Sequence, residues 1–324
     1  MPKAVIIHKT GGPEVLTIEN IAAPKEPGPG QVIIKQTAIG INFMDIYYRK
    51  GVYKAPRLPM IPGMEACGVV QSVGEGVTIP VGQRVIYATS QTGAYCQVRR
   101  ISEKHLIGIP DNIPDNVAVS IFAKALTAHY LLFRTCKINK GDIILVHAAA
   151  GGVGQILCQW AKYLGAYIIG VVGSANKIQV AQNNGCDMVV VSSQTDFTKQ
   201  VQQITNNKGV KIVFDSVGED TFKQSLKSLC PLGLMVSYGQ SSGKVSPVDI
   251  LSLAEKGLYL TRPTLKAYTS SRRELLFGAI EVFTALNNGI IRPDIGNQYT
   301  LDQIAKAHAD IESRKTTGSN IIIL

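Results

Sequence analysis

The sequence predicts an α/β fold with two domains, one rich in β-strands and one built on a doubly wound parallel sheet. Three observations predict it. The first third of the chain consists of short apolar runs broken by glycine and proline. The middle alternates apolar runs with helical segments, which indicates βαβ units. The chain then returns to a helix and a final apolar strand. With 324 residues, 45% of them hydrophobic, it can bury one large or two medium cores.

The first third predicts a Greek-key or barrel-like β domain. Apolar runs at residues 5–10, 31–39, 67–74 and 83–88 predict short strands. The segment Pro24–Gln31 (PKEPGPGQ) is typical of a turn-forming connection and does not indicate a hinge between domains.

The middle third predicts parallel strands joined by helices. A helix is expected from about Asn116 to Leu132. The apolar runs after it predict strands at residues 142–148, 166–173, 187–192, 210–217 and 234–239. Helices are expected between these strands, ending near Gly165, Asn184, Gln203 and Leu229.

The end of the chain predicts that the parallel-sheet domain is an insertion. A helix at residues 278–289 precedes the final strand, 319–324, which we expect to fold back onto the N-terminal domain. The predicted boundaries give residues 1–124 and 265–324 to the β-rich domain and residues 125–264 to the parallel-sheet domain.

The run GDIILVHAAAGGVGQILCQWAK, residues 141–162, predicts a dinucleotide-binding loop. A strand at Ile143–His147 leads through small residues into a helix from about Val153, which is the context that such a loop requires. Gly151 and Gly152 allow close approach to a pyrophosphate, and Gly154 allows the helix to pack on the sheet. The helix N-terminus offers N–H groups and a positive dipole end. Ala149 replaces the usual first glycine.

The same run resembles the signature of the quinone oxidoreductases, the zeta-crystallin-like, zinc-free branch of the medium-chain dehydrogenase/reductases. Further segments resemble that family in the same order: GGPEVL from Gly11, GINFMDIYYRKG from Gly40, VFDSVG from Val213 and SYGQSSG from Ser237. The resemblance covers essentially the whole chain. It implies a GroES-like catalytic domain and a Rossmann nucleotide-binding domain.

The residues after the second strand of the parallel sheet favour NADPH over NADH. NAD-specific sheets carry Asp or Glu about 20 residues past the glycines. Here Gly173, Ser174 and Lys177 occupy this corner without a carboxylate. Ser174 can hydrogen-bond a 2′-phosphate and Lys177 can neutralise it. The family resemblance also implies a phosphate-binding lysine here; the alternative is a plain surface lysine.

The resemblance implies further contacts. Asn42 and Tyr47 resemble residues that flank the nicotinamide and the substrate, and they are our candidate catalytic residues, as hydrogen-bond donors near the reacting oxygen. Alternatively, Asn42 is a turn residue. Tyr238 could equally be a core aromatic. Ser192 stands where the family often has Tyr or His beside the adenine. The complete set of predicted cofactor contacts is Asn42, Tyr47, Thr127, Gly151, Gly152, Val153, Gly173, Ser174, Lys177, Ser192, Tyr238, Gly239, Ser241, Arg262, Thr264 and Asn320.

The sequence predicts no metal site. A catalytic zinc needs three protein ligands. By resemblance to zinc alcohol dehydrogenases, Asp45 stands at the first ligand position, and the Gly-His-Glu motif reads Gly63-Met64-Glu65, with a methionine that is a poor zinc ligand. The cysteine-rich lobe of those enzymes is reduced to Cys96.

Composition narrows the class of protein. The formal charge is +10, but the basic residues are spread along the chain without a recognition motif, so specific nucleic-acid binding is not expected. A basic solvated surface, or steering of an anionic cofactor, explains the charge equally well. Six scattered cysteines favour a reducing cytoplasm. No apolar stretch approaches the roughly 20 residues of a membrane span, and no signal peptide is expected.

The expected activity is metal-free, NADPH-dependent reduction of quinones, by hydride or by single-electron transfer. The alternative within the enzyme class is reduction of the double bond in enones or enals. A hypothesis of another class is an RNA-binding or structural, crystallin-like role. We also expect a homodimer, because residues 257–261 resemble the edge strand that pairs across the twofold axis in this family.

Overall fold

The computed structural model describes residues 1–55, 57–89, 91–194 and 196–324. It divides into two compact units. Unit 1 comprises residues 1–123, 269–283 and 293–324, and unit 2 comprises residues 124–268 and 284–292. Residues 265–268 and 284–292 therefore lie in unit 2, although the sequence analysis assigned them to the β-rich domain.

Unit 1 is built on strands, as expected. A seven-stranded sheet has the order β14-β15-β3-β4-β5-β7, with β6 also paired to β3, and β1 and β2 form a separate antiparallel pair. Its elements are β1 (Lys3–Ile7), β2 (Leu16–Asn20), β3 (Gln31–Gly40), α1 (Phe43–Lys50), β4 (Glu65–Val73), β5 (Arg84–Ala88), β6 (Val98–Ser102), β7 (Ile107–Gly108), β14 (Ile295–Thr300), α9 (Ile304–Glu312) and β15 (Ser319–Ile323). Two longer helices, α2 (Asp115–Tyr130) and α8 (Arg272–Asn287), begin in unit 1 and end in unit 2.

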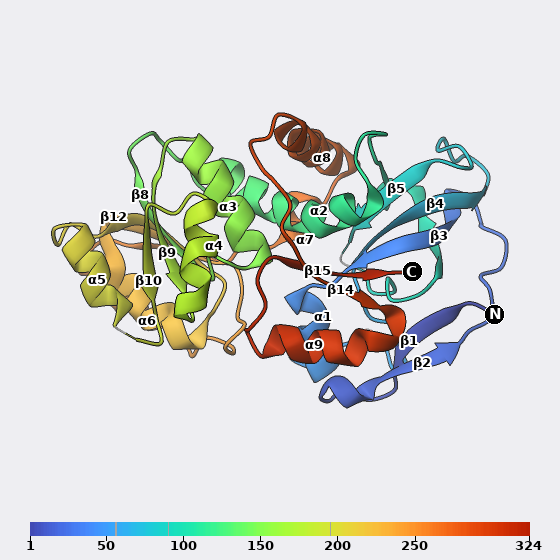
Figure 1. The fold of residues 1–324 in the computed structure, drawn as a ribbon, viewed down its shortest axis with the longest axis horizontal. Helices are drawn as coiled ribbons and strands as arrows, with labels where there is room; N and C mark the ends of the chain where they lie inside the picture. The colour runs from blue at the N-terminus through green and yellow to red at the C-terminus, as the bar shows by residue number, and fades with distance from the viewer. Residues whose placement is uncertain (56, 90, 195) are drawn as a thin grey trace. The chain divides into compact units, whose positions relative to one another are not determined.

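The last strand folds back onto the N-terminal part of the chain, which confirms the prediction. β15 pairs antiparallel with the end of β3, where Ile321 faces Gly40 and Ile323 faces Ala38. Figure 1 shows α1 and α9 together in this unit. Arg49 of α1 joins them through hydrogen bonds to His308 and Glu312 of α9.

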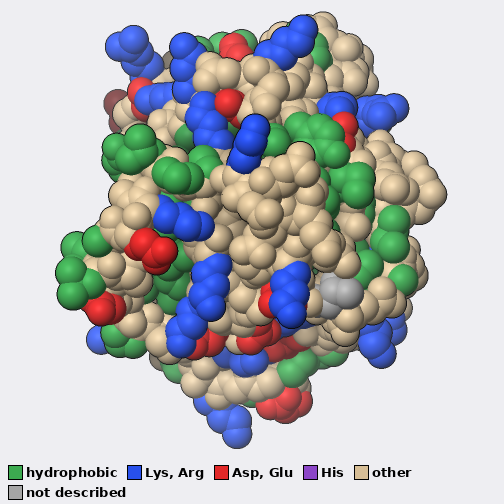
Figure 2. Space-filling model, turned by 90° about the vertical axis from the view of Figure 1, so that its left-hand side faces the viewer, with side chains coloured by type: hydrophobic (Ala, Val, Ile, Leu, Met, Phe, Trp, Pro, Cys, Tyr) green, Lys and Arg blue, Asp and Glu red, His purple; other side chains and the backbone are tan. Residues whose placement is uncertain are grey.

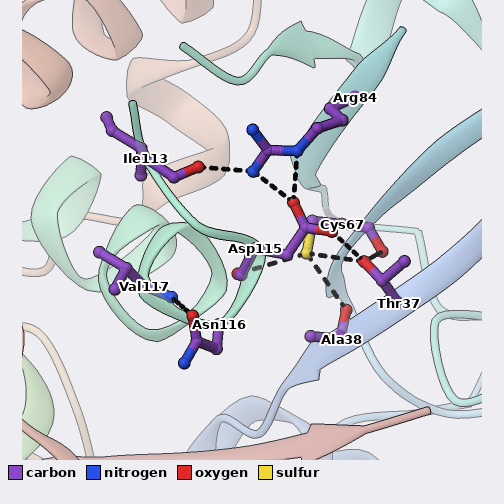
Figure 3. A network of polar contacts seen from close by, with 8 residues as sticks. All are labelled: Thr37, Ala38, Cys67, Arg84, Ile113, Asp115, Asn116 and Val117. Atoms are coloured by element: carbon purple, nitrogen blue, oxygen red, sulfur yellow. Dashed lines mark hydrogen bonds and ion pairs between the residues drawn. The ribbon is translucent and has the colours of Figure 1, made fainter. Parts of the chain in front are cut away.

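Asp115, the first residue of α2, fastens that helix to the sheet of unit 1 (Figure 3). Its Oδ1 accepts hydrogen bonds from Nε of Arg84 at 2.9 Å and from Nη2 at 2.5 Å. Its Oδ2 accepts one from Oγ1 of Thr37 at 2.5 Å. Cys67 is buried beside it, and burial raises the pKa of the Cys67 thiol to about 12, so this cysteine stays protonated.

Unit 2 is a doubly wound sheet of six parallel strands in the order β10-β9-β8-β11-β12-β13. Figure 1 shows α3 and α4 on one face of this sheet and α5 and α6 on the other. The elements are β8 (Ile143–His147), α3 (Gly152–Tyr163), β9 (Tyr167–Val172), α4 (Ile178–Asn183), β10 (Met188–Val191), α5 (Phe197–Ile204), β11 (Val210–Asp215), α6 (Glu219–Ser228), β12 (Leu229–Ser237), β13 (Tyr259–Thr261) and α7 (Leu265–Tyr268).

The predicted alternation of strands and helices is confirmed in unit 2, with small shifts at the ends. β12 begins at Leu229, five residues before the apolar run at Leu234 that predicted it. The central strand β8 is apolar because both faces are covered: Ile144, Leu145 and Val146 have no exposed surface. Short helical segments of one turn each also occur between these elements, at Pro13–Val15, Glu103–His105, Leu131–Thr135, Ala175–Lys177, Ile250–Leu253 and Leu301–Gln303.

One helical stretch is longer than expected, because the sequence predicted no apolar stretch long enough to cross a membrane. Asp115–Thr135 is long and apolar enough by length and composition, but 72% of its most apolar window is buried within the fold. It is a core helix of the fold.

Candidate functional site

A tight glycine turn joins β8 to α3 in unit 2. Ala148 has a φ of 51°, and the N–H of Gly151 donates to the carbonyl of Ala148 at 2.8 Å. α3 begins at Gly152, so its first N–H groups have no acceptor within the helix and point out of its N-terminus. A Cβ on Gly154 would lie 2.2 Å from the Ala148 carbonyl oxygen, so only glycine lets the helix approach the strand so closely.

This turn lies at the switch point of the sheet. From β8 the chain proceeds through β9 to β10 on one side, and β11 to β13 lie on the other, which is the 3-2-1-4-5-6 order of dinucleotide-binding sheets. In such sheets ligands bind in the crevice beyond the carboxyl ends of the strands, where the order reverses. A pyrophosphate therefore fits the turn and the first turn of α3.

The predicted cofactor contacts of unit 2 follow the carboxyl ends of its parallel strands, and so they share one edge of the sheet. The exception is Thr127, which is half-buried on α2. The residues at this edge are Gly151, Gly152 and Val153 after β8, Gly173, Ser174 and Lys177 after β9, Ser192 after β10, Tyr238, Gly239 and Ser241 after β12, and Arg262 and Thr264 after β13.

The corner after β9 is open and carries a cation. Gly173 is exposed, and a Cβ built on it meets no atom within 4 Å. Ser174 precedes the turn Ala175–Lys177, with its Oγ 2.5 Å from Oδ1 of Asn176. Lys177 is half-buried, and this burial lowers the pKa of its ammonium group. A phosphate dianion is well suited to compensate a partly desolvated ammonium group.

The ends of β10, β12 and β13 complete the edge. Ser192 is exposed, and its N–H donates to the carbonyl of Val172 at 2.9 Å. Tyr238 is half-buried, and desolvation raises the pKa of its hydroxyl. A Cβ on Gly239 would lie 2.5 Å from the carbonyl oxygen of Ser216, so glycine is required where β12 ends against β11. Arg262 and Thr264 are exposed and available to a ligand of this unit.

The remaining predicted residues lie together in unit 1. Asn42 is the residue before α1; its N–H donates to Oδ2 of Asp45 at 2.8 Å and its Nδ2 donates to Oε2 of Glu65 at 2.9 Å. Tyr47 is 8% exposed and packs against the ring of Tyr53 at 5.2 Å. Asn320 of β15 accepts the N–H of Ile41 on its carbonyl at 3.1 Å, next to Asn42. Its buried side-chain Oδ1 has no hydrogen-bond partner among the described residues.

Two buried carboxylates, Glu65 and Asp215, have contacts that the sequence did not predict. Glu65 bonds the candidate catalytic Asn42, yet we considered it only as a failed metal ligand. Asp215 ends β11 beside the switch point and accepts hydrogen bonds from the N–H of Val217 at 2.7 Å and from Oγ1 of Thr221 at 2.7 Å. The sequence did carry a signal for Asp215, because it is an acidic residue at the end of an apolar run. No neighbouring residue in the sequence indicated that Glu65 bonds Asn42.

The residues at the zinc-ligand positions do not fit a zinc ion. The Asp45 carboxylate already accepts the hydroxyl of Tyr95 and the N–H of Asn42. Met64 offers no strong ligand, and Glu65 accepts from Asn42 and from the N–H of Ala123. Among the described residues, no three His, Cys, Asp or Glu side chains gather as a metal site would require.

A hollow of about 570 Å³ in unit 1 shares several lining residues with the polar network of Figure 3. It is lined by Thr37, Ala38, Arg84, Asp115, Asn116, Gln298, Ile323 and Leu324. Its cation and anion, Arg84 and Asp115, are already paired with each other, so this network holds α2, β3 and β5 together.

Comparison with known proteins identifies the family. Residues 28–132 match the alcohol dehydrogenase GroES-like domain, and residues 152–283 match the zinc-binding dehydrogenase family. A quinone oxidoreductase of Pseudomonas aeruginosa is 42% identical over 325 residues, which cover 100% of both chains. The chain belongs to the quinone oxidoreductase family. The predicted family and the predicted combination of folds are thus confirmed.

Two further members of this group of enzymes are similar over their whole length. The structure of an Escherichia coli quinone oxidoreductase complexed with NADPH has a TM-score of 0.97 and 43% identity, covering 99% of this chain and 100% of that one. A 2-haloacrylate reductase of Burkholderia is 39% identical, covering 100% of this chain and 99% of that one.

Proposed function

We propose that this member of the quinone oxidoreductase family reduces quinones with NADPH and without a metal. The observation that carries the proposal is full-length identity above 40% to quinone oxidoreductases, one of them complexed with NADPH. The glycine turn at the switch point and the cationic corner after β9 support the same cofactor.

The cofactor contacts divide by their chemistry. Gly151, Gly152 and Val153 bind the pyrophosphate through backbone N–H groups. Gly173, Ser174 and Lys177 bind the 2′-phosphate, and Ser192 lies beside the adenine. The residues proposed to hold the rest of the cofactor, including its nicotinamide end, are Thr127, Tyr238, Gly239, Ser241, Arg262, Thr264, Asn42, Tyr47 and Asn320.

NADPH, when bound, supplies reducing equivalents from its nicotinamide ring. The protein's part is to orient the acceptor and to stabilise the negative charge that develops on its oxygen. Asn42 and Tyr47 are proposed to do this as hydrogen-bond donors. A quinone suits a site without a Lewis acid, because its ring delocalises the charge it gains, whereas an unactivated ketone needs stronger polarisation.

Reduction of a conjugated double bond is the second candidate. The 39% identity to a 2-haloacrylate reductase supports it. Such an acceptor also gains negative charge on a carbonyl or carboxylate oxygen, so the same donors would serve both reactions.

An RNA-binding or crystallin-like role has weaker support. On the face drawn in Figure 2, Lys and Arg side chains stand apart from one another, among neutral and acidic side chains. Nucleic-acid grooves usually gather their positive charge on one surface. A salt titration of RNA binding, with and without NADPH, tests this role; a steep salt slope without sequence preference indicates charge attraction alone.

The same proposal includes a homodimer that acts in the cytoplasm. β13 is the edge strand of the unit 2 sheet, and Tyr259 and Leu260 on it are exposed. An uncovered apolar edge favours pairing with a second copy.

The experiment is an acceptor panel with the purified protein. NADPH oxidation is followed with 1,4-benzoquinone, a naphthoquinone, menadione, small alkenals and 2-chloroacrylate, and then with NADH in place of NADPH. We expect saturable activity on the quinones, with preference for NADPH. Saturable activity on the alkenals or 2-chloroacrylate, with none on the quinones, would instead establish the second candidate.

A further inference from the structure

Glu65 is a buried carboxylate that bonds Asn42 with one of its two oxygens. It has no exposed surface. Its Oε2 accepts from Nδ2 of Asn42 at 2.9 Å, and its Oε1 accepts from the N–H of Ala123 at 2.7 Å. Because each of these two groups donates to a different oxygen, this site suits a carboxylate, which accepts on both oxygens.

The contact fixes which way round the Asn42 amide lies. An ionised carboxylate has no hydrogen to donate, so the amide must turn its nitrogen, and not its oxygen, toward Glu65. One of the two Nδ2 hydrogens is then used by Glu65, and the other points away from it. The N–H of Asn42 is also held, by Oδ2 of Asp45 at 2.8 Å, so backbone and side chain are both fixed.

The opposite strand leaves room for this carboxylate. Gly40 faces Glu65 in the β3–β4 pair. A Cβ on Gly40 would lie 2.2 Å from Oε2 and 2.7 Å from the carboxyl carbon of Glu65. Any other residue at position 40 would therefore displace the oxygen that Asn42 contacts.

We propose that Glu65 is a positioning residue, which orients the Asn42 amide so that its second N–H is presented to the acceptor oxygen during reduction. The inference rests on the proposed function, in which Asn42 donates to that oxygen. It gives Glu65 a role in orienting Asn42. The position of Glu65 in the segment Gly63-Met64-Glu65, which resembles a zinc-ligand motif, does not by itself suggest this role.

The decisive variant is Glu65→Gln, which keeps size and removes one acceptor. If the glutamine oxygen still accepts from the Ala123 N–H, its new NH₂ group faces Nδ2 of Asn42. The two donors are reconciled only if the Asn42 amide turns its Oδ1 toward the glutamine, so the amide loses its wild-type orientation. We expect kcat to fall about tenfold or more, as for loss of one oriented donor. The Kd for NADPH should change less than about twofold, because the contacts of unit 2 remain and only the Asn42 contact at the nicotinamide end is altered. Glu75→Gln, an exposed site in unit 1, is the matched control.

A double variant separates positioning from a merely structural contact. In Glu65→Gln with Asn42→Asp, the glutamine NH₂ donates to the new carboxylate, so the hydrogen bond returns with reversed polarity. The side chain of residue 42 then has no N–H to offer the acceptor. We expect the melting temperature to recover while kcat stays low. Recovery of both, or an unchanged kcat and KM in Glu65→Gln alone, would overturn the inference.

A readout without turnover completes the test. In the protein without NADPH, the Asn42 NH₂ resonances are assigned by their loss in Asn42→Asp. We expect two widely separated proton shifts, because only one proton bonds a carboxylate, and this separation should collapse in Glu65→Gln. Unchanged resonances would overturn the inference. Inactivity of the wild-type enzyme on every acceptor would instead refute the proposed function, and the resonances would then decide the orientation of Asn42 alone.

Discussion

Nη1 of Arg49 lies 3.2 Å from Nδ1 of His308, and both side chains are fully buried in unit 1. A guanidinium only donates, so Nδ1 of His308 must accept and Nε2 must carry the hydrogen. Nε2 lies 3.0 Å from the hydroxyl of Tyr95, which donates in turn to Oδ2 of Asp45 at 2.8 Å. The tautomer of one histidine thus sets the direction of a chain of hydrogen bonds that ends beside Asn42.

His308 should make the enzyme less stable in acid. Burial first, and the charge of Arg49 second, lower the pKa of His308 from 6.5 to about 3. The unfolded chain therefore binds this proton at a higher pH than the folded chain does. Its contribution to stability is complete above about pH 6.5 and is lost as the pH falls toward 3, by about 1.4 kcal/mol per pH unit. Urea unfolding at a series of pH values measures the slope.

His308→Gln isolates this effect, because glutamine can accept from Arg49 and donate to Tyr95 without titrating. Its unfolding free energy should fall less steeply below about pH 6.5 than that of the wild type. His8→Gln removes an exposed imidazole as the matched control. Identical slopes for wild type and His308→Gln would contradict the assigned pKa.

Lys177→Ala should reduce the preference for NADPH. Removal of one cation from a phosphate contact should raise the KM for NADPH about tenfold or more and leave the KM for NADH unchanged. Steady-state kinetics with both cofactors measure the ratio, with Lys199→Ala, at an exposed site on α5, as control. An unchanged preference would show that the 2′-phosphate is bound elsewhere.

Gly154→Ala should destabilise unit 2. The added Cβ would lie 2.2 Å from the Ala148 carbonyl oxygen and 2.9 Å from Cα of Ala149, and backbone atoms cannot move aside as a flexible side chain can. We expect a cost of about 1–3 kcal/mol, and weaker NADPH binding because the turn must shift. Gly173→Ala, whose Cβ meets nothing within 4 Å, is the matched control. Equal melting temperatures of the two variants without cofactor would refute the packing argument.

Leu260→Asp should dissociate the proposed dimer. Leu260 is the middle residue of β13, so pairing of β13 with its own copy across a twofold axis brings the two Leu260 side chains close together. Two carboxylates there would repel each other. Sedimentation velocity should give twice the 34.9 kDa chain mass for the wild type and the single mass for the variant. Tyr163→Asp, at an exposed site on α3, is the control; a monomeric wild type would refute the dimer.

The sequence predicted unit 2 well because its signals are local. Buried parallel strands appear as continuous apolar runs, and the glycine turn lies within a dozen residues of the strand and helix it joins. The corner around Lys177 was visible for the same reason, since it follows β9 directly.

The contacts that position the candidate residues of unit 1 were not visible. Arg49 and His308 are 259 residues apart, and Asn42 and Glu65 are 23 apart on different elements. Periodicity shows that a side chain is buried, but it does not show which buried acid meets which donor. The apolar stretch of α2 was underestimated because polar residues such as Ser120, Lys124 and Thr127 interrupt it in the sequence, although the helix as a whole is long and apolar enough.

The place of β15 also affects how the chain is made. The six strands of unit 2 end at Thr261, whereas the sheet of unit 1 lacks β14 and β15 until residues 295–323 have been translated. On the ribosome, the strands of the unit 2 sheet are complete first, while the C-terminal end of β3 is paired on one edge only, with β4. β15 covers the other edge only after residues 319–323 have been translated, so a ribosome that stalls before residue 319 leaves that edge open to other nascent chains.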